Sequence, residues 1–91
     1  MIFEYDEQKS SINKLKHGID FHEAQELWND PYAFELPSSQ NEEEARFLVL
    51  GQINLKNYTA IITHRDENIR IISVRRSREK EKKLYESIRN R

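Results

Sequence analysis

The 91-residue chain contains no cysteine, only two glycines and two prolines, and no long hydrophobic run. Without cysteine, disulfides, thiol catalysis and Cys-ligated zinc sites are excluded. The longest apolar run, residues 47–50, is far shorter than the ~20 residues of a membrane-spanning helix, and the first residues lack the apolar stretch of a secretion signal. We therefore expect a cytoplasmic protein that forms one domain over residues 1–91.

Hydrophobic residues make up 36% of the chain and charged residues 34%, which predicts a thin core and a highly charged surface. An aromatic content of 10% is nevertheless too high for a disordered chain of mixed charge. The histidines are too scattered to predict a metal site by their spacing: His17, His22 and His64. A compact fold without metal or cofactor is the expectation.

The net charge of −1 hides an uneven distribution. Residues 1–64 carry five Lys and Arg against eleven Asp and Glu, whereas residues 65–91 carry ten against five, a local charge of +5. Clustered positive charge raises the potential toward polyanions such as nucleic acid even in a nearly neutral protein. A charged helix that is simply exposed to solvent has the same composition. Charge alone therefore does not distinguish such a helix from a surface that binds nucleic acid.

The N-terminal third predicts one strand and two helices. Residues 2–5 form a short strand, and Asp6 caps a helix that ends at the left-handed Gly18, with Ile12 and Leu15 on its inner face. The second helix starts with a capping box and ends at residues 29–31. The box is formed by Asp20 and Glu23, and the apolar stripe by Phe21, Ala24, Leu27 and Trp28.

From residue 32 the pattern has a period of two, which predicts strands. In residues 32–36, the large apolar side chains of Tyr32, Phe34 and Leu36 alternate with Ala33 and Glu35. Residues 37–44 form a polar loop that we expect to be the most mobile segment. Strands at 46–52, 58–64 and 69–76 follow, joined by an Asn- and Gly-containing turn and by a turn at 66–68, and should form an antiparallel meander.

Ser77 is a suitable cap for a last helix to about Arg89, with Leu84 and Ile88 facing inward. The element order β-α-α-β-β-β-β-α predicts an α+β fold with two N-terminal helices, an antiparallel meander sheet and a C-terminal helix.

Five arginines lie within 14 positions around the last strand: Arg65, Arg70, Arg75, Arg76 and Arg78. We expect the turn at 66–68 to place Arg65 opposite Ile69. In that register, His64 and Arg70 share one face of the sheet, and Arg65 and Arg75 share the other. A different register, shifted by one residue, would change which residues share each face. Such a density of guanidiniums requires anionic partners, which are carboxylates inside the protein or phosphates outside it.

Glu81 and Tyr85 lie four residues apart and therefore share one face of the last helix. Glu81 beside arginines is a candidate general base, and Tyr85 a candidate acid or base-stacking surface, although both also suit a plain helix-surface contact or a partner for Arg75. His64 is a candidate proton shuttle or a packed edge residue.

Two blocks of residues give the sequence a specific resemblance. They are Phe3, Glu4, Tyr5, Asp6, Lys9, Asn13, Lys16, His17, Gly18, Phe21, Ala24, Trp28, Asp30 and Pro31, followed by Arg46, Gly51, Arg65, Arg70, Ile71, Ile72, Ser73, Val74, Arg75, Glu81 and Tyr85. In this order and spacing, which covers nearly the whole chain, the sequence resembles the BrnT toxin family.

The resemblance implies a small RelE-like ribonuclease toxin of a type II toxin–antitoxin pair that inhibits translation. It also implies a BrnA-like antitoxin, which binds operator DNA on behalf of the complex, in an expected assembly of two copies of each chain. The residues that match functional positions of the family are Arg65, Arg70, Arg75, Glu81 and Tyr85.

RNA carries its own nucleophile, the 2′-hydroxyl, so arginines can support its cleavage without a metal. We expect Arg65 and Arg75 to clamp phosphate, Glu81 to act as base or to orient an arginine, and Arg70 or His64 to complete the site. The residues expected to bind RNA are Arg76, Arg78, Lys82 and Tyr85. The rival hypotheses are a non-catalytic nucleic-acid-binding module and a structural subunit of a repressor complex with internal ion pairs.

Overall fold

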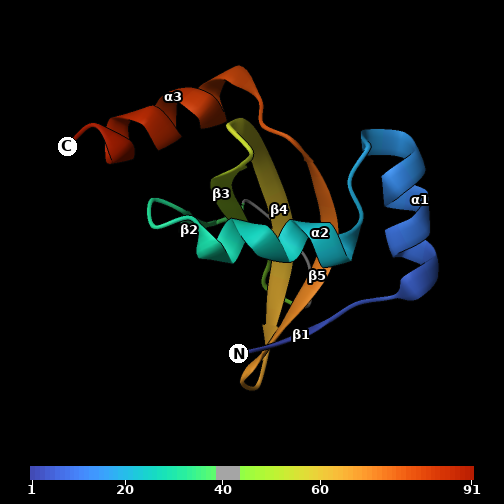
Figure 1. Cartoon of the computed structure of the whole chain (residues 1–91). Coiled ribbons are helices and arrows are strands. Elements are labelled where there is room, and N and C mark those ends of the chain that lie inside the picture. The colour runs from blue at the N-terminus through green and yellow to red at the C-terminus, as the bar shows by residue number, and fades with distance from the viewer. Residues whose placement is uncertain (39–43) are drawn as a thin grey trace.

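The computed structural model describes residues 1–38 and 44–91, so most of the predicted polar loop lies outside the described residues. The predicted element order is confirmed (Figure 1). The elements are β1 (Ile2–Glu4), α1 (Glu7–His17), α2 (Phe21–Ala24), the 3-10 helix η1 (Gln25–Asn29), β2 (Phe34–Pro37), β3 (Phe47–Ile53), β4 (Lys56–Arg65), β5 (Asn68–Arg76) and α3 (Glu79–Arg89). No helix within the described ranges is long and apolar enough to cross a membrane.

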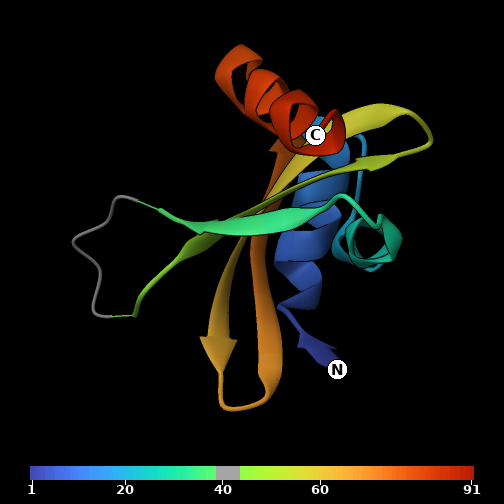
Figure 2. The same ribbon diagram turned by 90° about the vertical axis from the view of Figure 1, so that its left-hand side faces the viewer.

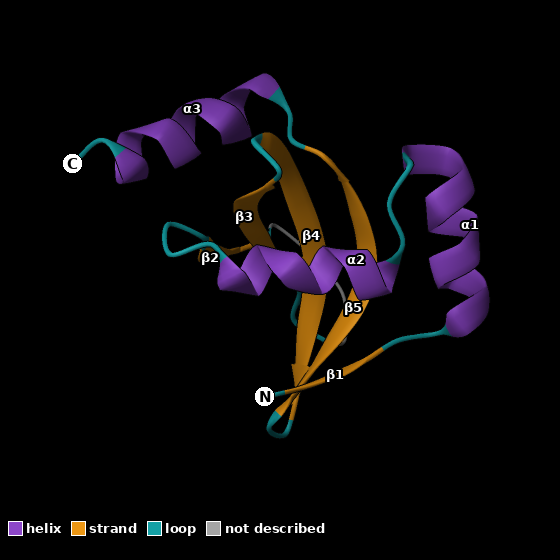
Figure 3. Ribbon diagram, viewed as in Figure 1, coloured by secondary structure: helices purple, strands orange, loops and turns teal. Residues whose placement is uncertain are grey.

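The strands form one five-stranded sheet in the order β1-β5-β4-β3-β2 (Figure 3). Strands β3 to β5 make the predicted antiparallel meander, and β2 extends it by pairing antiparallel with β3. Strand β1 adds to β5 in parallel, with Ile2 opposite Asn68. The first strand therefore lies beside the last strand of the chain, and the sheet is mixed although mostly antiparallel.

Helices α2 and η1 cross one face of this twisted sheet, α1 packs beside them at the β5 edge, and α3 crosses one end (Figure 1 and Figure 2). The core lies between that face and the helices, and its members are Ile19, Phe21, Ala24, Leu27, Val49, Ala60, Ile62, Ile69, Ile71 and Val74. Phe3 packs edge-on against Trp28, with ring centroids 4.8 Å apart. The predicted stripe of the second helix thus faces the core, with Trp28 half-buried.

The predicted ends of α1 are confirmed, but its predicted inner face is wrong. Asp6 accepts hydrogen bonds from the backbone N–H groups of Gln8 and Lys9, and Gly18 ends the helix with a φ of 77°. Ile12 and Leu15, however, are 54% and 88% exposed. The helix turns a polar face to the protein instead.

Asn13 explains this orientation of α1. Its Nδ2 donates to the carbonyl oxygens of Ile19 (2.9 Å) and Val74 (2.8 Å), and its Oδ1 accepts from the Val74 N–H (3.3 Å). Val74 lies beyond the short stretch of β5 that β1 covers, so its outer N–H and C=O have no partner among the described strands. The helix therefore docks through an amide that satisfies an open sheet edge, and buried backbone groups need such partners.

Gly51 lies inside β3, and the turn between β3 and β4 is made by Asn54 and Leu55 with positive φ angles of 49° and 66°. A Cβ at Gly51 would approach Leu27 Cδ2 to 3.0 Å and Ala33 Cβ to 3.1 Å. A side chain at this position would have to displace these neighbours by a few tenths of an ångström, so glycine allows Leu27 of η1 to lie close against the sheet.

The last helix also differs from its prediction. Arg78, and not Ser77, is the N-cap residue, because the Ser77 hydroxyl is buried against that of Thr59 at 2.9 Å. Leu84, predicted to face inward, is 40% exposed, whereas Tyr85 is only 1% exposed. The inner face of α3 therefore carries Glu81 and Tyr85.

We expect Asn13→Ala to destabilise the protein by roughly 2–4 kcal/mol, because the N–H and C=O groups of Val74 lose their partners while buried. Leu15→Ala, on the same helix, should change the free energy of unfolding by less than about 0.5 kcal/mol, since that side chain already contacts water. Urea unfolding measures both values. A larger loss for Leu15→Ala would show that the apolar positions of α1 face the core after all.

Candidate functional site

The register of β4 and β5 places three arginines on one sheet face. Arg65 lies opposite Asn68, joined by a two-residue turn in which Asp66 adopts a φ of 56°, so Arg70 lies opposite Thr63. Opposite residues share a face, and alternate residues of β4 do too. Arg70 is therefore on the same face as Arg65.

A β-bulge brings Arg75 to this face as well. Ile62 pairs with Ile71, but Ile61 pairs with Ser73, so one extra residue of β5 is accommodated and Arg75 lies opposite Thr59. The predicted register, one residue different, placed Arg70 with His64, and that prediction is wrong. We call the face that carries Arg65, Arg70 and Arg75 the arginine face; it is opposite to the face covered by α2 and η1.

The three arginines are spread along this face in two groups. Thr59 and Arg65 are six residues apart on β4, which corresponds to about 20 Å at ~3.3 Å per residue. We call the group at the end near α3 the helix-end cluster, made of Thr59, Arg75, Ser77 and Glu81. The group at the β4–β5 turn is the hairpin-end cluster, made of Glu4, Glu44, Arg65 and Arg70.

In the helix-end cluster, Glu81 holds the Arg75 guanidinium in a bidentate pair. Arg75 Nη1 and Nη2 donate to Glu81 Oε1 and Oε2 at 2.8 and 2.9 Å. Glu81 Oε1 also accepts from the Thr59 hydroxyl (2.9 Å) and the Arg78 backbone N–H (2.7 Å). Because Thr59 donates its proton to Glu81, the Ser77 hydroxyl must donate to Thr59.

These contacts set the ionisation of Glu81. Burial alone raises its pKa, but the hydrogen bonds from Arg75, the Arg78 N–H and Thr59 outweigh burial and lower the pKa to about 2. Arg75 Nη1 also donates to the Arg76 carbonyl at 3.3 Å. Within the part of the chain that the structure describes, the Arg75 Nε–H and the second Nη2 proton have no protein acceptor, so this fixed guanidinium can still bind an anion.

In the hairpin-end cluster, both arginines are paired with carboxylates. Arg65 Nε and Nη2 donate to Glu44 at 2.9 and 3.3 Å, which lowers the pKa of Glu44. Glu4 Oε1 lies 3.6 Å from Arg65 and 3.5 Å from Arg70. These pairs are partly exposed, so solvent screens them and a stronger anion can compete for the arginines.

Tyr85 is buried and its hydroxyl donates to Asp30 Oδ2 at 2.8 Å. Burial and this hydrogen bond raise its pKa to about 12, so the phenol stays protonated at neutral pH. The same Asp30 oxygen accepts from the Gln52 backbone N–H at 2.8 Å. Tyr85 thus anchors α3 to the segment after η1, and in this position its ring is not available to stack on a base.

Of the other predicted site residues, His64, Arg76 and Lys82 lie apart from both clusters. His64 is on the face of α2 and η1, with Nε2 at 2.9 Å from Glu35 Oε2 and its ring against Phe47. Arg76 is on that face too and covers the Tyr58 ring at 5.4 Å. Lys82 Nζ is 3.4 Å from Glu79. Arg78 lines a groove beside Glu81, so it is the one of these residues that adjoins the helix-end cluster.

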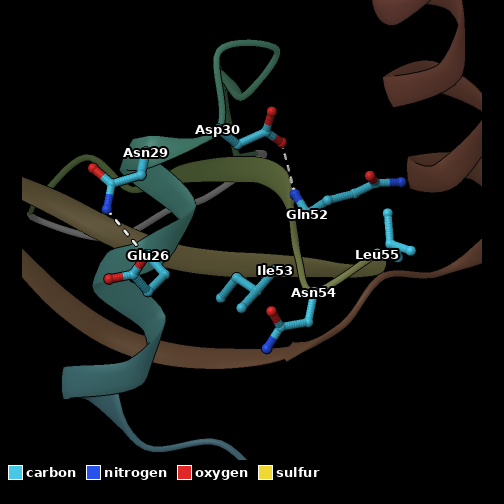
Figure 4. Close-up of a pocket in the computed structure, with 7 residues that line it drawn as sticks. All are labelled: Glu26, Asn29, Asp30, Gln52, Ile53, Asn54 and Leu55. Carbon is cyan, nitrogen blue, oxygen red and sulfur yellow. Dashed lines mark hydrogen bonds between the residues drawn. The ribbon is translucent and has the colours of Figure 1, made fainter.

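A cavity of about 550 Å³ lies beside η1 and the β3–β4 turn, and none of the predicted site residues lines it (Figure 4). Its polar groups are partly paired with each other, Asn29 Nδ2 with Glu26 at 3.0 Å and Asp30 with the Gln52 N–H. In the described ranges, 1–38 and 44–91, no group of three or more His, Asp or Glu side chains is arranged to hold a metal ion.

Sequence reasoning missed Thr59, Ser77 and Asp30. Thr59 and Ser77 read as ordinary strand and cap residues, and Asp30 as the end of a helix. The one available signal was Glu81, which lies three residues after the cap Arg78, the spacing at which a glutamate reaches back to a helix N-terminus.

The Glu81 ion pair makes stability sensitive to acid. Since the pKa of Glu81 falls from an ordinary 4.5 to about 2 on folding, its contribution is complete above pH 4.5 and is lost as the pH falls through 2. When the pH is lowered from 4.5 to 2, the free energy of unfolding should fall by roughly 3 kcal/mol more in the wild type than in Glu81→Gln. Urea unfolding at several pH values tests this, and Glu79→Gln, an exposed change on the same helix, should follow the wild type. Equal acid sensitivity of Glu81→Gln and wild type would contradict it.

Comparison with protein-family models matches residues 5–81 to the family described as "Ribonuclease toxin, BrnT, of type II toxin-antitoxin system". The matched range contains every member of the two clusters except Glu4. A comparison with curated proteins gave no match. Because the family model covers most of the chain, the resemblance found in the sequence is confirmed, and the chain belongs to the BrnT family of ribonuclease toxins of type II toxin–antitoxin systems.

Proposed function

We propose that this chain is a metal-independent endoribonuclease that cuts RNA by attack of the 2′-hydroxyl on the neighbouring phosphate, with the helix-end cluster as its reaction centre. The observation that carries the proposal is the Arg75 guanidinium, which Glu81 fixes at two points while two of its N–H groups have no acceptor among the described residues. Cleavage of cellular RNA would stop translation.

The chemistry needs a preorganised positive charge. In this step the 2′-oxygen bonds to phosphorus and the bond between phosphorus and the 5′-oxygen breaks, while water takes the 2′-hydroxyl proton and water protonates the leaving 5′-oxygen. The attack places additional negative charge on the phosphate oxygens, and donors that are already in position stabilise that charge without reorganisation. Arginine remains protonated at any physiological pH and its planar donors match phosphate geometry. A guanidinium fixed in this way can therefore supply the charge stabilisation by itself.

Within this proposal, Arg75 binds the reacting phosphate and Glu81 is a positioning residue. Glu81 already accepts four hydrogen bonds, and a carboxylate with a pKa of about 2 is a poor base, so of its two expected roles we favour the orienting one. Arg65 and Arg70 bind flanking phosphates in exchange for Glu44 and Glu4.

Arg78 and Lys82 would extend the RNA path along α3. His64 and Arg76 lie on the other face and Tyr85 is buried, so none of the three enters the proposed reaction centre. The proposed partner is a BrnA-like antitoxin, with two copies of each chain in the complex and with operator DNA bound only through the antitoxin. The cytoplasm, where RNA and antitoxin are found, is the proposed location.

A structural role is the second candidate, and the hairpin-end cluster favours it. There the arginines already have protein carboxylates as partners, as expected for internal ion pairs. The two candidates differ in what the loss of one arginine changes, namely the cleavage rate of the folded protein or its stability.

Arg75→Ala is expected to lower the rate of RNA cleavage by about 100- to 1,000-fold, the usual effect of removing one donor to a developing oxyanion. Arg76→Ala changes the neighbouring arginine on the opposite face and should leave the rate within about threefold. Rates are measured on a synthetic RNA with protein freed from its antitoxin, at a temperature where circular dichroism shows both variants folded. An unchanged rate in folded Arg75→Ala would leave this arginine only a structural role.

The products identify the nucleophile. Attack by the 2′-hydroxyl should yield 2′,3′-cyclic or 3′-phosphate and 5′-hydroxyl ends, which mass spectrometry detects, and a 2′-deoxy substitution at the cut site should prevent cleavage. Activity should persist in excess EDTA. Loss of activity in EDTA that added Mg²⁺ or Mn²⁺ restores, or 5′-phosphate products, would refute this mechanism.

A further inference from the structure

We propose that an apolar groove between α3 and strands β2 and β3 is the site where the antitoxin inserts an apolar side chain from an acidic segment. This inference rests on the proposed function insofar as the chain has an antitoxin, and it adds where and by what chemistry that partner binds. The groove lies on the arginine face, beside the helix-end cluster.

Four leucines form the groove. Leu36 of β2 and Leu48 and Leu50 of β3 make the floor, Leu84 of α3 makes one wall, and the volume is about 500 Å³. Leu84 is 40% exposed and Leu36 and Leu48 are half-buried, whereas Leu50 is 1% exposed and forms only the bottom of the groove. Helices α2 and η1 cover the other face of the sheet, so they cannot bury these side chains (Figure 2). Grouped aliphatic side chains left in contact with water favour a partner that covers them.

Charges at the groove select the partner. Arg78 and Lys80 line the groove with Glu79 and Glu81, and Glu81 is neutralised by Arg75. Residues 78–91 carry six Lys and Arg against three Glu. An apolar side chain flanked by carboxylates complements both the leucine floor and this basic margin.

An RNA base fits the groove less well than a protein side chain. Single-stranded RNA is bound by stacking of its bases on aromatic rings, and none of the described residues that line the groove is aromatic. Glu81 belongs to both the groove and the helix-end cluster. An antitoxin segment bound in the groove therefore lies against Arg75 and prevents RNA from reaching it. In this proposal the antitoxin inhibits RNA cleavage because it covers the groove and the adjoining helix-end cluster together.

Leu84→Asp tests the groove, because it removes an apolar wall and places a negative charge where an acidic segment would bind. Titration calorimetry with the purified cognate antitoxin should show affinity reduced by at least about 30-fold, the scale of an interface hot spot. Leu15→Asp and Leu55→Asp are matched controls, since these leucines are 88% and 86% exposed and lie outside the groove. Both should bind within about threefold of wild type.

Lys80→Glu provides a second variant that does not depend on the packing of α3, because Lys80 is exposed at the groove. It should weaken binding by about tenfold at low salt and by less at high salt, since exposed charges are screened. Wild-type affinity in both variants would overturn the proposal.

Co-expression separates this proposal from the proposed ribonuclease activity. Leu84→Asp should cut RNA like wild type and arrest growth even when the antitoxin is present, whereas both controls should be neutralised. If Leu84→Asp instead loses RNA cleavage and keeps antitoxin affinity, the groove belongs to the RNA site and the docking proposal is wrong. If wild-type protein cuts no RNA but Leu84→Asp still loses antitoxin binding, the enzymatic proposal fails and the docking proposal stands.

Discussion

The bidentate pair between Arg75 and Glu81 joins the sheet to the last helix. Through Thr59 and the Arg78 N–H, the same carboxylate also connects β4 and the first turn of α3. Partly buried charges persist in a fold only when they are paired, because a lone one loses its hydration without compensation. This pair holds the first turn of α3 against the sheet and fixes the guanidinium on the arginine face, while Tyr85 anchors the same helix through Asp30.

The elements predicted correctly are those that a few neighbouring residues determine. Asp20 and Glu23 form the expected capping box, at 2.7 and 2.9 Å, and Gly18 adopts the left-handed conformation that ends α1. The strand order of the meander followed from short turns between alternating segments. Each of these signals lies within a few neighbouring residues, so the structure it predicts does not depend on contacts with distant parts of the chain.

The predictions that were wrong concern features that depend on contacts between segments far apart in the sequence. Ile12 and Leu15 suggested an apolar inner face for α1, but the open backbone of Val74, 61 residues from Asn13, drew the polar face inward. The candidate site was predictable in its residue types and in part of its arrangement. Arg65 and Arg75 share a face and Glu81 pairs with Arg75, as the sequence suggested, whereas Arg70 lies on the other face from the one predicted. A two-residue turn and one bulge decide which face Arg70 and Arg75 share, and neither feature has a sequence pattern strong enough to fix a register to one residue.

The amide of Asn13 also limits how other chains can associate with this one. A strand edge with free N–H and C=O groups is a template for addition of a foreign strand, and thus for aggregation. On β5 that edge is occupied by β1 at residues 68–70 and by Asn13 at Val74. The opposite edge of the described sheet is β2, which spans four residues and ends at Pro37, a residue without an N–H. Few backbone groups at the two edges of the described sheet are therefore free to pair with a strand of another molecule. Partners of this toxin must bind through its side chains, and two copies of the toxin have little opportunity to aggregate by pairing their sheets.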